Sequence, residues 1–371
     1  MTSSASIHSL LDRVMARGWA TREEAYALIR VSRGDLAAVM AAASRMRDEA
    51  KGRVVTFSRN VFIPLTNMCR NRCAYCTFVK APSDPRAHTL TPEEVLRIAE
   101  EGARHGCREA LFSLGDKPEL LHRRAREDLR RLGYDSTFAY LKDMCALVWE
   151  ETGLWPHANP GVLSYEQMAQ LREVTASMGL MLESVSERLL QPGQAHYGCP
   201  DKVPAVRLRM IEDAGKLRIP FTTGILIGIG ETPEERVDSL LAIRDVHRRY
   251  GHIQEVIVQN FRAKPDIPFR DRPEPDLFEM LRTLAVARLI LGGEMNIQAP
   301  PNLSPDAYGV YLLAGINDWG GISPVTRDHI NPEAPWPKEE ELRRVTHAAG
   351  FTLVERLPVY PEYMTSQTSN E

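Results

Sequence analysis

Three cysteines near residue 70 stand at a spacing typical of iron–sulfur ligands. Cys69, Cys73 and Cys76 form the pattern C-x3-C-x2-C, directly after an apolar run at residues 61–65. Iron–sulfur clusters are held by cysteine thiolates and normally take four of them. With only three thiolates in reach, a [4Fe-4S] cluster keeps one iron open. The spacing therefore indicates a cluster that binds a substrate or cofactor directly at the metal.

A structural zinc site is the alternative interpretation of these cysteines. Zinc in such sites takes four ligands in a closed tetrahedron, usually from paired Cys or Cys/His knuckles. No second cysteine pair follows, and the next histidine, His88, lies beyond a proline-containing loop. A non-catalytic zinc-binding barrel or adaptor would therefore lack its fourth ligand. The remaining cysteines, at 107, 145 and 199, stand alone and are interpreted as small buried residues.

Alternating strands and helices are expected to position the cysteine loop. Apolar runs predict strands at residues 61–65, 110–114, 155–158, 180–185, 221–229, 253–258 and 295–299. Helices separate these runs, and three of them begin with capping boxes at Thr91, Ser164 and Thr232. Repeated strand–helix units indicate an α/β fold with a parallel sheet, which right-handed crossovers close into a full or partial (β/α) barrel. An open, doubly wound sheet is the competing architecture. In a barrel, the cysteine loop lies at the carboxyl ends of the strands, where such folds carry out their chemistry.

The chain of 371 residues divides into four expected segments. Residues 1–52 predict an N-terminal helical cap, with a capping box at Thr21 and Glu24. Residues 53–303 predict the barrel core, with the cysteine loop at 67–78. Residues 304–363 predict a C-terminal extension with substrate-side loops, a helix at 338–349 and a strand at 351–357. Residues 364–371 are polar and predict a disordered tail.

Composition and charge exclude several classes of partner. The net charge is −3 and hydrophobic residues make up 43%, an ordinary globular mix. Arginines gather at residues 123–131, but Glu127 and Asp128 lie among them, which is typical of a solvated helix face. We therefore expect neither a nucleic-acid partner nor a membrane partner. No run of about 18 apolar residues and no signal peptide occur, so we expect a cytoplasmic protein with reduced thiols.

The cysteine pattern followed by α/β repeats resembles the radical S-adenosylmethionine (SAM) superfamily. The flanking segments are similar to the CofG subunit of 7,8-didemethyl-8-hydroxy-5-deazariboflavin (FO) synthase. These segments are residues 61–66 (VFIPLT), 76–78 (CTF), 113–119 (SLGDKPE), 318–324 (DWGGISP) and 331–333 (NPE), and the similarity runs from about residue 54 to 363. The resemblance implies a TIM-type barrel of the radical SAM kind. It also implies one [4Fe-4S] cluster on Cys69, Cys73 and Cys76, with SAM at the open iron.

The activity that this resemblance implies is that of a radical lyase and cyclase. A 5′-deoxyadenosyl radical would abstract hydrogen from 5-amino-5-(4-hydroxybenzyl)-6-(D-ribitylimino)-5,6-dihydrouracil. Cyclisation with loss of ammonia would then give the deazaflavin of the factor-420 coenzyme. A CofH-type partner subunit would supply the substrate, and a low-potential donor would supply electrons. A radical SAM enzyme with another substrate, biotin-synthase-like or tyrosine-cleaving, is the alternative.

The resemblance also implies a set of SAM-binding residues. The expected set is Tyr75, Gly115, Asp116, Glu183, Ser184, Arg207, Gly228 and Gln259. Asp116 stands where the superfamily often has Glu, and its carboxylate can still accept a hydrogen bond from the methionine amino group. A buried Glu183 needs a partner, either the ribose hydroxyls of SAM or, in the alternative, an ion pair with Arg207. For Gly115 and Asp116 the alternative is a simple turn after a strand.

Polar residues at further strand ends and loops predict a substrate site. The expected residues are Asn159, Asn302, Asn317, Asp318 and Asp328. Their amides and carboxylates suit a uracil ring and a ribityl chain, both rich in hydrogen-bonding groups. Turn chemistry, which also favours Asn and Asp, is the alternative for each residue singly. Asp116 and Asp318 are candidates for a catalytic group by position alone.

Overall fold

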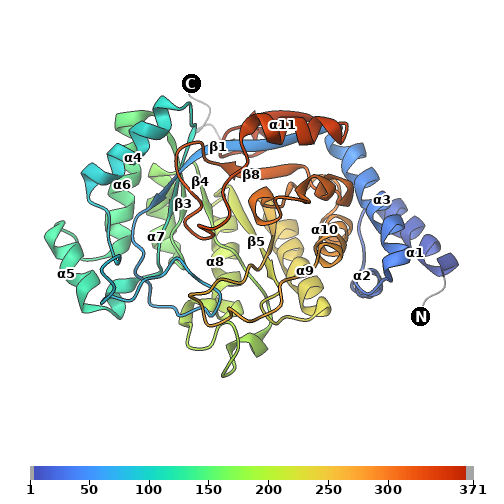
Figure 1. Ribbon diagram of the computed structural model, residues 1–371, viewed down its shortest axis with the longest axis horizontal. Helices are drawn as coiled ribbons and strands as arrows, with labels where there is room; N and C mark the ends of the chain where they lie inside the picture. The colour runs from blue at the N-terminus through green and yellow to red at the C-terminus, as the bar shows by residue number, and fades with distance from the viewer. Residues whose placement is uncertain (1–3, 365–371) are drawn as a thin grey trace.

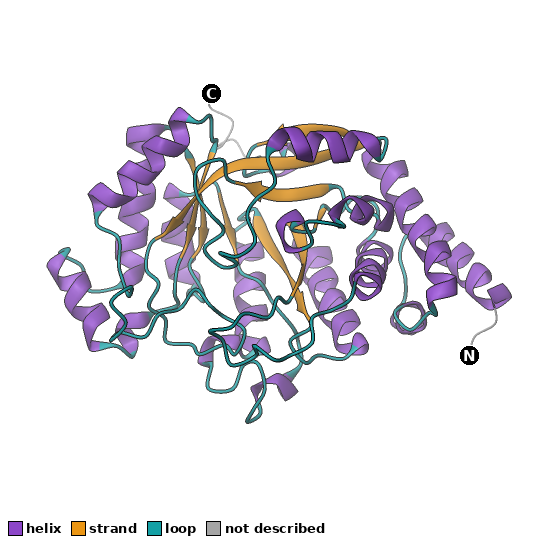
Figure 2. Ribbon diagram, viewed as in Figure 1, coloured by secondary structure: helices purple, strands orange, loops and turns teal. Residues whose placement is uncertain are grey.

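Parallel strands close into a barrel in the computed structural model, which describes residues 4–364 (Figure 1). The strand order is β2-β3-β4-β5-β6-β7-β8-β1, and β1 also pairs with β2, which closes the ring. Figure 2 shows the strands at the centre with helices around them. The closed ring confirms the TIM-type barrel and excludes the open, doubly wound sheet.

The elements have the following bounds. The strands are β1 (Val54–Pro64), β2 (Glu109–Ser113), β3 (Trp155–Asn159), β4 (Ser177–Gly179), β5 (Phe221–Ile227), β6 (Ile253–Asn260), β7 (Ile297–Gln298), β8 (Asp318–Ile322) and β9 (Thr352–Arg356). The α-helices are α1 (Ser4–Arg17), α2 (Arg22–Leu28), α3 (Arg33–Lys51), α4 (Pro92–Arg104), α5 (Arg123–Arg131), α6 (Thr137–Thr152), α7 (Tyr165–Leu171), α8 (Pro204–Lys216), α9 (Pro233–Tyr250), α10 (Leu277–Leu291) and α11 (Glu339–Ala348).

The predicted capping boxes begin four of these helices. Thr91, Ser164 and Thr232 each accept a hydrogen bond from the backbone N–H three residues on, and the side chain there accepts from the cap N–H. Thr21 and Glu24 begin α2 in the same way. These reciprocal bonds satisfy backbone N–H groups that have no partner within the helix. The sequence prediction of these helix starts is confirmed.

Three strands differ from their prediction. Strand β1 begins at Val54, seven residues before the expected strand at 61–65. The expected strand at 180–185 is instead β4 at Ser177–Gly179, and the chain then turns through Glu183, whose φ is +66°. A side chain at positive φ is unfavourable, so an apolar run alone does not reveal this turn. The last barrel strand, β8, lies beyond the expected core boundary at residue 303. Its glycine-rich sequence lacks the β-branched and aromatic pattern that identifies strands.

The N-terminal helices lie beside the barrel. α3 packs on α10, and α2 packs on α9 and α10, as the blue segments at the right of Figure 1 show. The backbone N–H of Ala20 donates to the carbonyl of Leu289 at 2.7 Å. The predicted helical segment therefore supports the outer wall of the barrel and lies against its helices.

Strand β1 pairs with two strands in succession along one of its edges. Its residues 54–58 pair with β9, and its residues 60–64 pair with β2. Because parallel strands share one direction, β9 extends the sheet at the amino-terminal end of the barrel. The last residue of β9, Arg356, lines a cavity inside the barrel. The C-terminal extension thus closes the amino-terminal end of the barrel interior.

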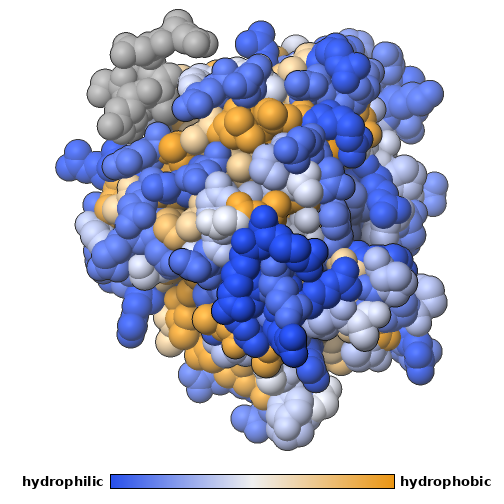
Figure 3. Space-filling view, turned by 90° about the vertical axis from the view of Figure 1, so that its left-hand side faces the viewer, coloured by the Kyte–Doolittle hydropathy of each residue, from blue (hydrophilic) through white to orange (hydrophobic). Residues whose placement is uncertain are grey.

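The surface over α5 matches the expectation of a solvated helix. Arg123 pairs with Glu127, and Arg131 pairs with Asp128, at 2.6 and 2.7 Å. Figure 3 views the side of the molecule on which α5 lies, where a strongly hydrophilic patch faces the viewer. None of the helices in residues 4–364 has the length and apolar character that crossing a membrane requires. The expected tail at 364–371 lies, except for Met364, outside the described residues.

Candidate active site

All three cysteines of the C-x3-C-x2-C pattern line one cavity of about 340 Å³, here called the cysteine cavity. Residues that end β2, β3 and β4 line it as well, so it lies at the carboxyl end of the barrel. The backbone N–H groups of Asn71 and Asp116 point at the Cys69 sulfur, at 3.3 and 3.1 Å. Burial raises the pKa of the Cys69 thiol to about 12 against these two donors. A ligating metal must therefore displace the thiol proton, and the two donors then stabilise the thiolate.

The donor set of this loop fits an iron–sulfur cluster better than a single ion. Among residues 4–364, no three His, Cys, Asp or Glu side chains come together as a metal-ion site. Each cysteine of a cubane cluster ligates a different iron, so its sulfurs stand farther apart than the ligands of one zinc ion. Here the three free cysteines line one cavity, which leaves space for a cluster beside them. The arrangement counts against the zinc alternative.

Gly115 allows the cysteine loop to pack on the end of β2. A Cβ atom at this position would lie 1.9 Å from the carbonyl oxygen of Met68 and 2.8 Å from the Cβ of Cys69. Both are atoms of the cysteine loop, and the first belongs to the backbone. Only glycine therefore permits the observed approach.

Replacing Gly115 by alanine is expected to displace the cysteine loop and to reduce the iron that anaerobic reconstitution incorporates. Overpacking of this kind costs about 1–3 kcal/mol, and here it acts on the first ligand. Iron per chain, measured after desalting, checks the expectation. Gly34→Ala is the control, because a Cβ there meets only Ser32 Oγ at an ordinary 3.6 Å. Equal iron in both variants would contradict this interpretation of Gly115.

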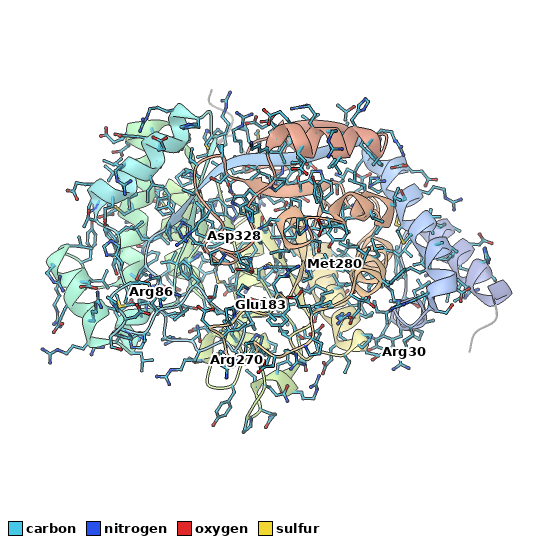
Figure 4. All side chains as sticks on the ribbon, viewed as in Figure 1. Arg30, Arg86, Glu183, Arg270, Met280 and Asp328 are labelled. Carbon is cyan, nitrogen blue, oxygen red and sulfur yellow. The ribbon has the colours of Figure 1, made fainter. Side chains whose placement is uncertain are left out.

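Glu183 carries a buried carboxylate on the wall of the cysteine cavity. Its Oε1 accepts a hydrogen bond from Lys202 Nζ at 2.5 Å, and a guanidinium nitrogen of Arg207 lies 4.0 Å away. Burial opposes ionisation, but the two cations outweigh it and lower the pKa of Glu183. Figure 4 shows Glu183 near the middle of the molecule. The expected partner Arg207 is thus present, but Lys202, which the sequence did not single out, is closer.

Asp116 lines the cysteine cavity beside the cysteine loop, and its backbone carbonyl accepts a hydrogen bond from the N–H of Arg70 at 3.1 Å. Its Oδ2 accepts a hydrogen bond from the N–H of Val162 at 3.0 Å, and Lys117 Nζ lies 2.6 Å from Oδ1. Burial raises the pKa of Asp116, although Lys117 acts in the other direction. A carboxylate in this position can accept a further hydrogen bond from an ammonium group.

Most of the residues expected to bind SAM line the cysteine cavity. Those that line it are Tyr75, Gly115, Asp116, Glu183, Arg207 and Gln259. Ser184 and Gly228 do not line it: the Ser184 hydroxyl accepts from the N–H of Ser186, and the N–H of Gly228 donates to Glu231. The Tyr75 hydroxyl lies 3.0 Å from Nε2 of His196, which orients its ring. The structure therefore brings together six of the eight predicted residues.

Two of the five expected substrate residues line a cavity inside the barrel. Asn159 and Asp328 do so, and Figure 4 shows Asp328 above Glu183. Asn302 instead donates to Asp328 at 2.9 Å. Asn317 accepts from Arg288 and from the N–H of Ile297, both at 2.9 Å. These two amides, like Asp318 below, hold the frame and do not line the cavity.

Asp318 and Glu255 share one buried arginine, Arg356. Asp318 accepts from Arg356 Nε at 2.7 Å and from the Tyr360 hydroxyl at 2.7 Å, and Glu255 accepts from Arg356 Nη2 at 2.8 Å. Burial is the main reason that the pKa of Glu255 rises to about 8; Arg356 opposes the rise, and Asp318 adds to it. At neutral pH the protein therefore retains a protonated carboxyl group in its barrel.

The free energy of unfolding is expected to decrease as the pH rises, because of Glu255. Its pKa is about 8 in the folded chain, against an ordinary 4.5. The contribution of the protonated Glu255 carboxyl group to the free energy of unfolding is complete below pH 4.5. It is lost as the pH rises through 8, by at most about 1.4 kcal/mol per pH unit. Urea unfolding at several pH values from 5.5 to 8, compared with Glu255→Gln, measures it. Parallel curves for the two proteins would contradict the expectation.

Several residues in or beside the cysteine cavity carry no signal in the sequence. Lys202 lies 19 positions from Glu183, in a single 3-10 turn before α8. Lys264 lines the cysteine cavity and donates to Asn331 at 2.9 Å. The sulfur of Cys199 lies 3.8 Å from that of Cys73, although Cys199 was expected to be an isolated core residue. Only the closed barrel brings these positions together.

Known proteins similar to this chain identify its family. The model of the radical SAM superfamily matches residues 63–243. A 7,8-didemethyl-8-hydroxy-5-deazariboflavin synthase from Methanopyrus kandleri is 55% identical over 311 residues, which cover 84% of this chain and 93% of that protein. An FO synthase from Nocardia farcinica is 54% identical over 353 residues, which cover 92% of this chain. The matched region is only 41% of that relative, so this chain spans less than half its length.

Solved structures agree on the fold. The [FeFe]-hydrogenase maturase HydG superposes with a TM-score of 0.78 at 17% identity, covering 95% of this chain and 76% of that one. Methylornithine synthase (PylB) gives 0.71 at 22% identity, with 93% and 97% covered. At these identities the likeness supports the barrel alone. The family follows from the sequence relatives: this chain belongs to the 7,8-didemethyl-8-hydroxy-5-deazariboflavin synthase family of the radical SAM superfamily.

Proposed function

We propose that this chain closes the deazaflavin ring. It converts 5-amino-5-(4-hydroxybenzyl)-6-(D-ribitylimino)-5,6-dihydrouracil to 7,8-didemethyl-8-hydroxy-5-deazariboflavin with loss of ammonia, as a carbon–nitrogen lyase. The carrying observation is the 55% identity to the M. kandleri synthase, of which the match covers 93%. The FO synthase relatives are more than twice as long as the matched region. We therefore assign this chain the CofG-type role and expect a CofH-type partner to supply the adduct.

The chain is a radical SAM enzyme, and its superfamily uses a [4Fe-4S] cluster and SAM. When bound, these groups supply a 5′-deoxyadenosyl radical, with one electron from a low-potential donor. Cys69, Cys73 and Cys76 hold the cluster in this proposal. Their position around one cavity, with backbone N–H donors at Cys69, supports the assignment.

The polar groups of the cysteine cavity match the polar ends of SAM. Asp116 accepts hydrogen bonds from the methionine amino group, and Arg207 donates to the methionine carboxylate. Glu183 accepts from the ribose hydroxyls, while Lys202 keeps its carboxylate ionised. Charge-assisted hydrogen bonds of this kind are about twice as strong as neutral ones. Gln259 and Tyr75 complete the adenine side of the cavity.

The barrel wall protects a reactive carbon radical. Phe62, Leu111, Leu226 and Ile257 line the cavity between its polar groups. These side chains exclude water and hold the substrate against the radical, so that the C–H bond nearest to it belongs to the substrate. The closed sheet makes this wall continuous, which an open sheet would not.

Anaerobic incubation of the reconstituted protein with dithionite, SAM and the adduct tests the proposal. The expected products are 5′-deoxyadenosine, by chromatography, and a fluorescent deazaflavin. Deoxyadenosine without fluorescence would retain the superfamily chemistry and reject this substrate. A second reaction with tyrosine in place of the adduct distinguishes the tyrosine-cleaving alternative, since cleavage would release 4-hydroxybenzyl-derived products.

A further inference from the structure

A second cavity, of about 190 Å³, lies inside the barrel next to the cysteine cavity; it is called here the floor cavity. Phe62, Leu111 and Ile257 line both cavities, so the two meet at an apolar collar. Asn159 and Gln259 also belong to both. The two cavities are therefore separated by no more than one layer of side chains.

The register of the strands shows which cavity is deeper. On β2, Glu109 lines the floor cavity, Leu111 lines both cavities, and Ser113 lines the cysteine cavity. Side chains two residues apart face the same side of a strand, so these three residues lie in successive layers.

The same order holds on the neighbouring strands. His157 on β3 and Glu255 on β6 line only the floor cavity, and both lie two residues before a residue that lines both cavities. The floor cavity therefore lies toward the amino-terminal ends of the strands, away from the cysteine loop.

The floor layer has an unusual chemistry for a barrel of this kind. Interior layers of TIM barrels are normally filled by branched apolar side chains. Here the layer is hollow and carries three carboxyl groups, an arginine, an imidazole and amides; among these are Glu109, Glu255, Asp328, Arg356, His157 and Asn60. Buried polar groups without partners are costly. A hollow polar layer thus indicates a ligand with many hydrogen-bonding groups.

Asn60 supplies an independent indication of a ligand. Its side chain is only 2% exposed, and its Oδ1 has no hydrogen-bond partner among the described residues. The Nε1 of Trp336, on the same cavity, also lacks a partner there. Native proteins leave few such groups unsatisfied. An unpaired acceptor and an unpaired donor on residues that line one cavity match hydroxyl groups, because a hydroxyl can donate to one and accept from the other.

We infer that the floor cavity binds the ribityl chain of the substrate, an uncharged polyol, while the apolar collar contacts the ring system. This assignment rests on the proposed function and orients the substrate within it. The polyol points away from the cysteine loop, so the ring carbons lie toward the bound SAM.

The charge of the floor layer excludes a phosphorylated chain. Glu109 and Asp328 line it with no lysine, and the charge of Arg356 is already matched by the carboxylate of Asp318. A phosphate would meet net negative charge in a poorly screened site. The cavity thus selects the free polyol over its phosphate ester.

Equilibrium binding to the reconstituted holoenzyme tests the assignment without turnover. The probes are the fluorescent product deazaflavin, its analogue with N-methyl in place of the ribityl group, and its ribityl-5′-phosphate. Wild type is expected to bind the product at least about tenfold more tightly than either analogue, since several hydrogen bonds are at stake. Fluorescence anisotropy measures all three.

Two variants test whether the ribityl group is bound by residues of the floor cavity. Asn60→Ala and the nearly isosteric Glu109→Gln are expected to weaken product binding about tenfold and about threefold, and to leave the N-methyl analogue unchanged. Iron content and circular dichroism confirm that each is folded. Equal weakening of both probes, or no change in either, would overturn the assignment. Product formation is measured separately. If binding depends on the ribityl chain but no product forms, only the proposed function is rejected. If product forms but binding does not depend on the ribityl chain, only the assignment of the floor cavity is rejected.

Discussion

Replacing Cys69, Cys73 or Cys76 by alanine is expected to reduce the formation of 5′-deoxyadenosine and of the deazaflavin to background. Each substitution removes one of three thiolate ligands, and an incompletely ligated cluster is lost on reconstitution. The barrel itself should remain folded, because the three side chains line a cavity and are not packed in its core. Anaerobic iron analysis, the visible absorption of the cluster and chromatography of the nucleoside measure the effect.

Cys199→Ala is the matched control for these variants. Its sulfur lies 3.8 Å from that of Cys73, yet it stands outside the C-x3-C-x2-C pattern. We expect this variant to keep its iron and its deoxyadenosine formation. If it lost the cluster as completely as Cys73→Ala, Cys199 would be a fourth ligand, and no iron would remain open for SAM. That result would contradict the proposed chemistry at its first step.

Removing the carboxylate of Asp318 is expected to destabilise the protein by about 3–5 kcal/mol. Its side chain is fully buried, and that of Arg356 is 8% exposed. Asp318→Ala would leave this arginine with Glu255 alone, which accepts from Arg356 Nη2 at 2.8 Å. Breaking a buried pair by removing one partner carries a cost of this size. Urea unfolding of the cluster-free protein, followed by tryptophan fluorescence, measures it.

Asp213→Ala provides the comparison for an exposed pair. Asp213 contacts Lys216, whose side chain is 47% exposed, and exposed pairs contribute about 0–1 kcal/mol. A large loss in Asp318→Ala and a small one in Asp213→Ala would establish Asp318 as a structural residue. The opposite pattern, normal stability with no product, would return Asp318 to the reacting groups that its sequence position first suggested.

The parts of the fold that could be predicted depend on local sequence. Capping boxes at Thr91, Ser164 and Thr232 require only the four residues that form them, and all three were confirmed. The cysteine loop was predicted for the same reason, because its pattern spans eight residues. Strands with continuous apolar runs, such as β5 and β6, were placed to within a few residues. In each case the signal lies within one turn or one strand.

The parts that escaped prediction depend on contacts between distant segments. β8 is recognisable only by its pairing with β1 and β7. Lys202 gains its role from Glu183, which adopts a positive φ that the sequence does not reveal. Glu109 and Glu255 lie on different strands, so neither suggests a polar layer until the barrel closes. Closure therefore creates both the ion pairs and the floor cavity.

Strand β1 connects the two ends of the interior. Its N-terminal half pairs with β9 at the amino-terminal end of the barrel, next to the floor cavity, and its C-terminal end leads into the cysteine loop. The five residues of extended strand from Asn60 to Pro64 span about 13 Å between the first and the last. Because one rigid strand fixes that separation, a substrate anchored in the floor cavity has its ring system held at a set distance from the cysteine loop. Under the proposed function, a substrate whose tail is one carbon shorter or longer is expected to place a different C–H bond beside the bound SAM and so to give a different product.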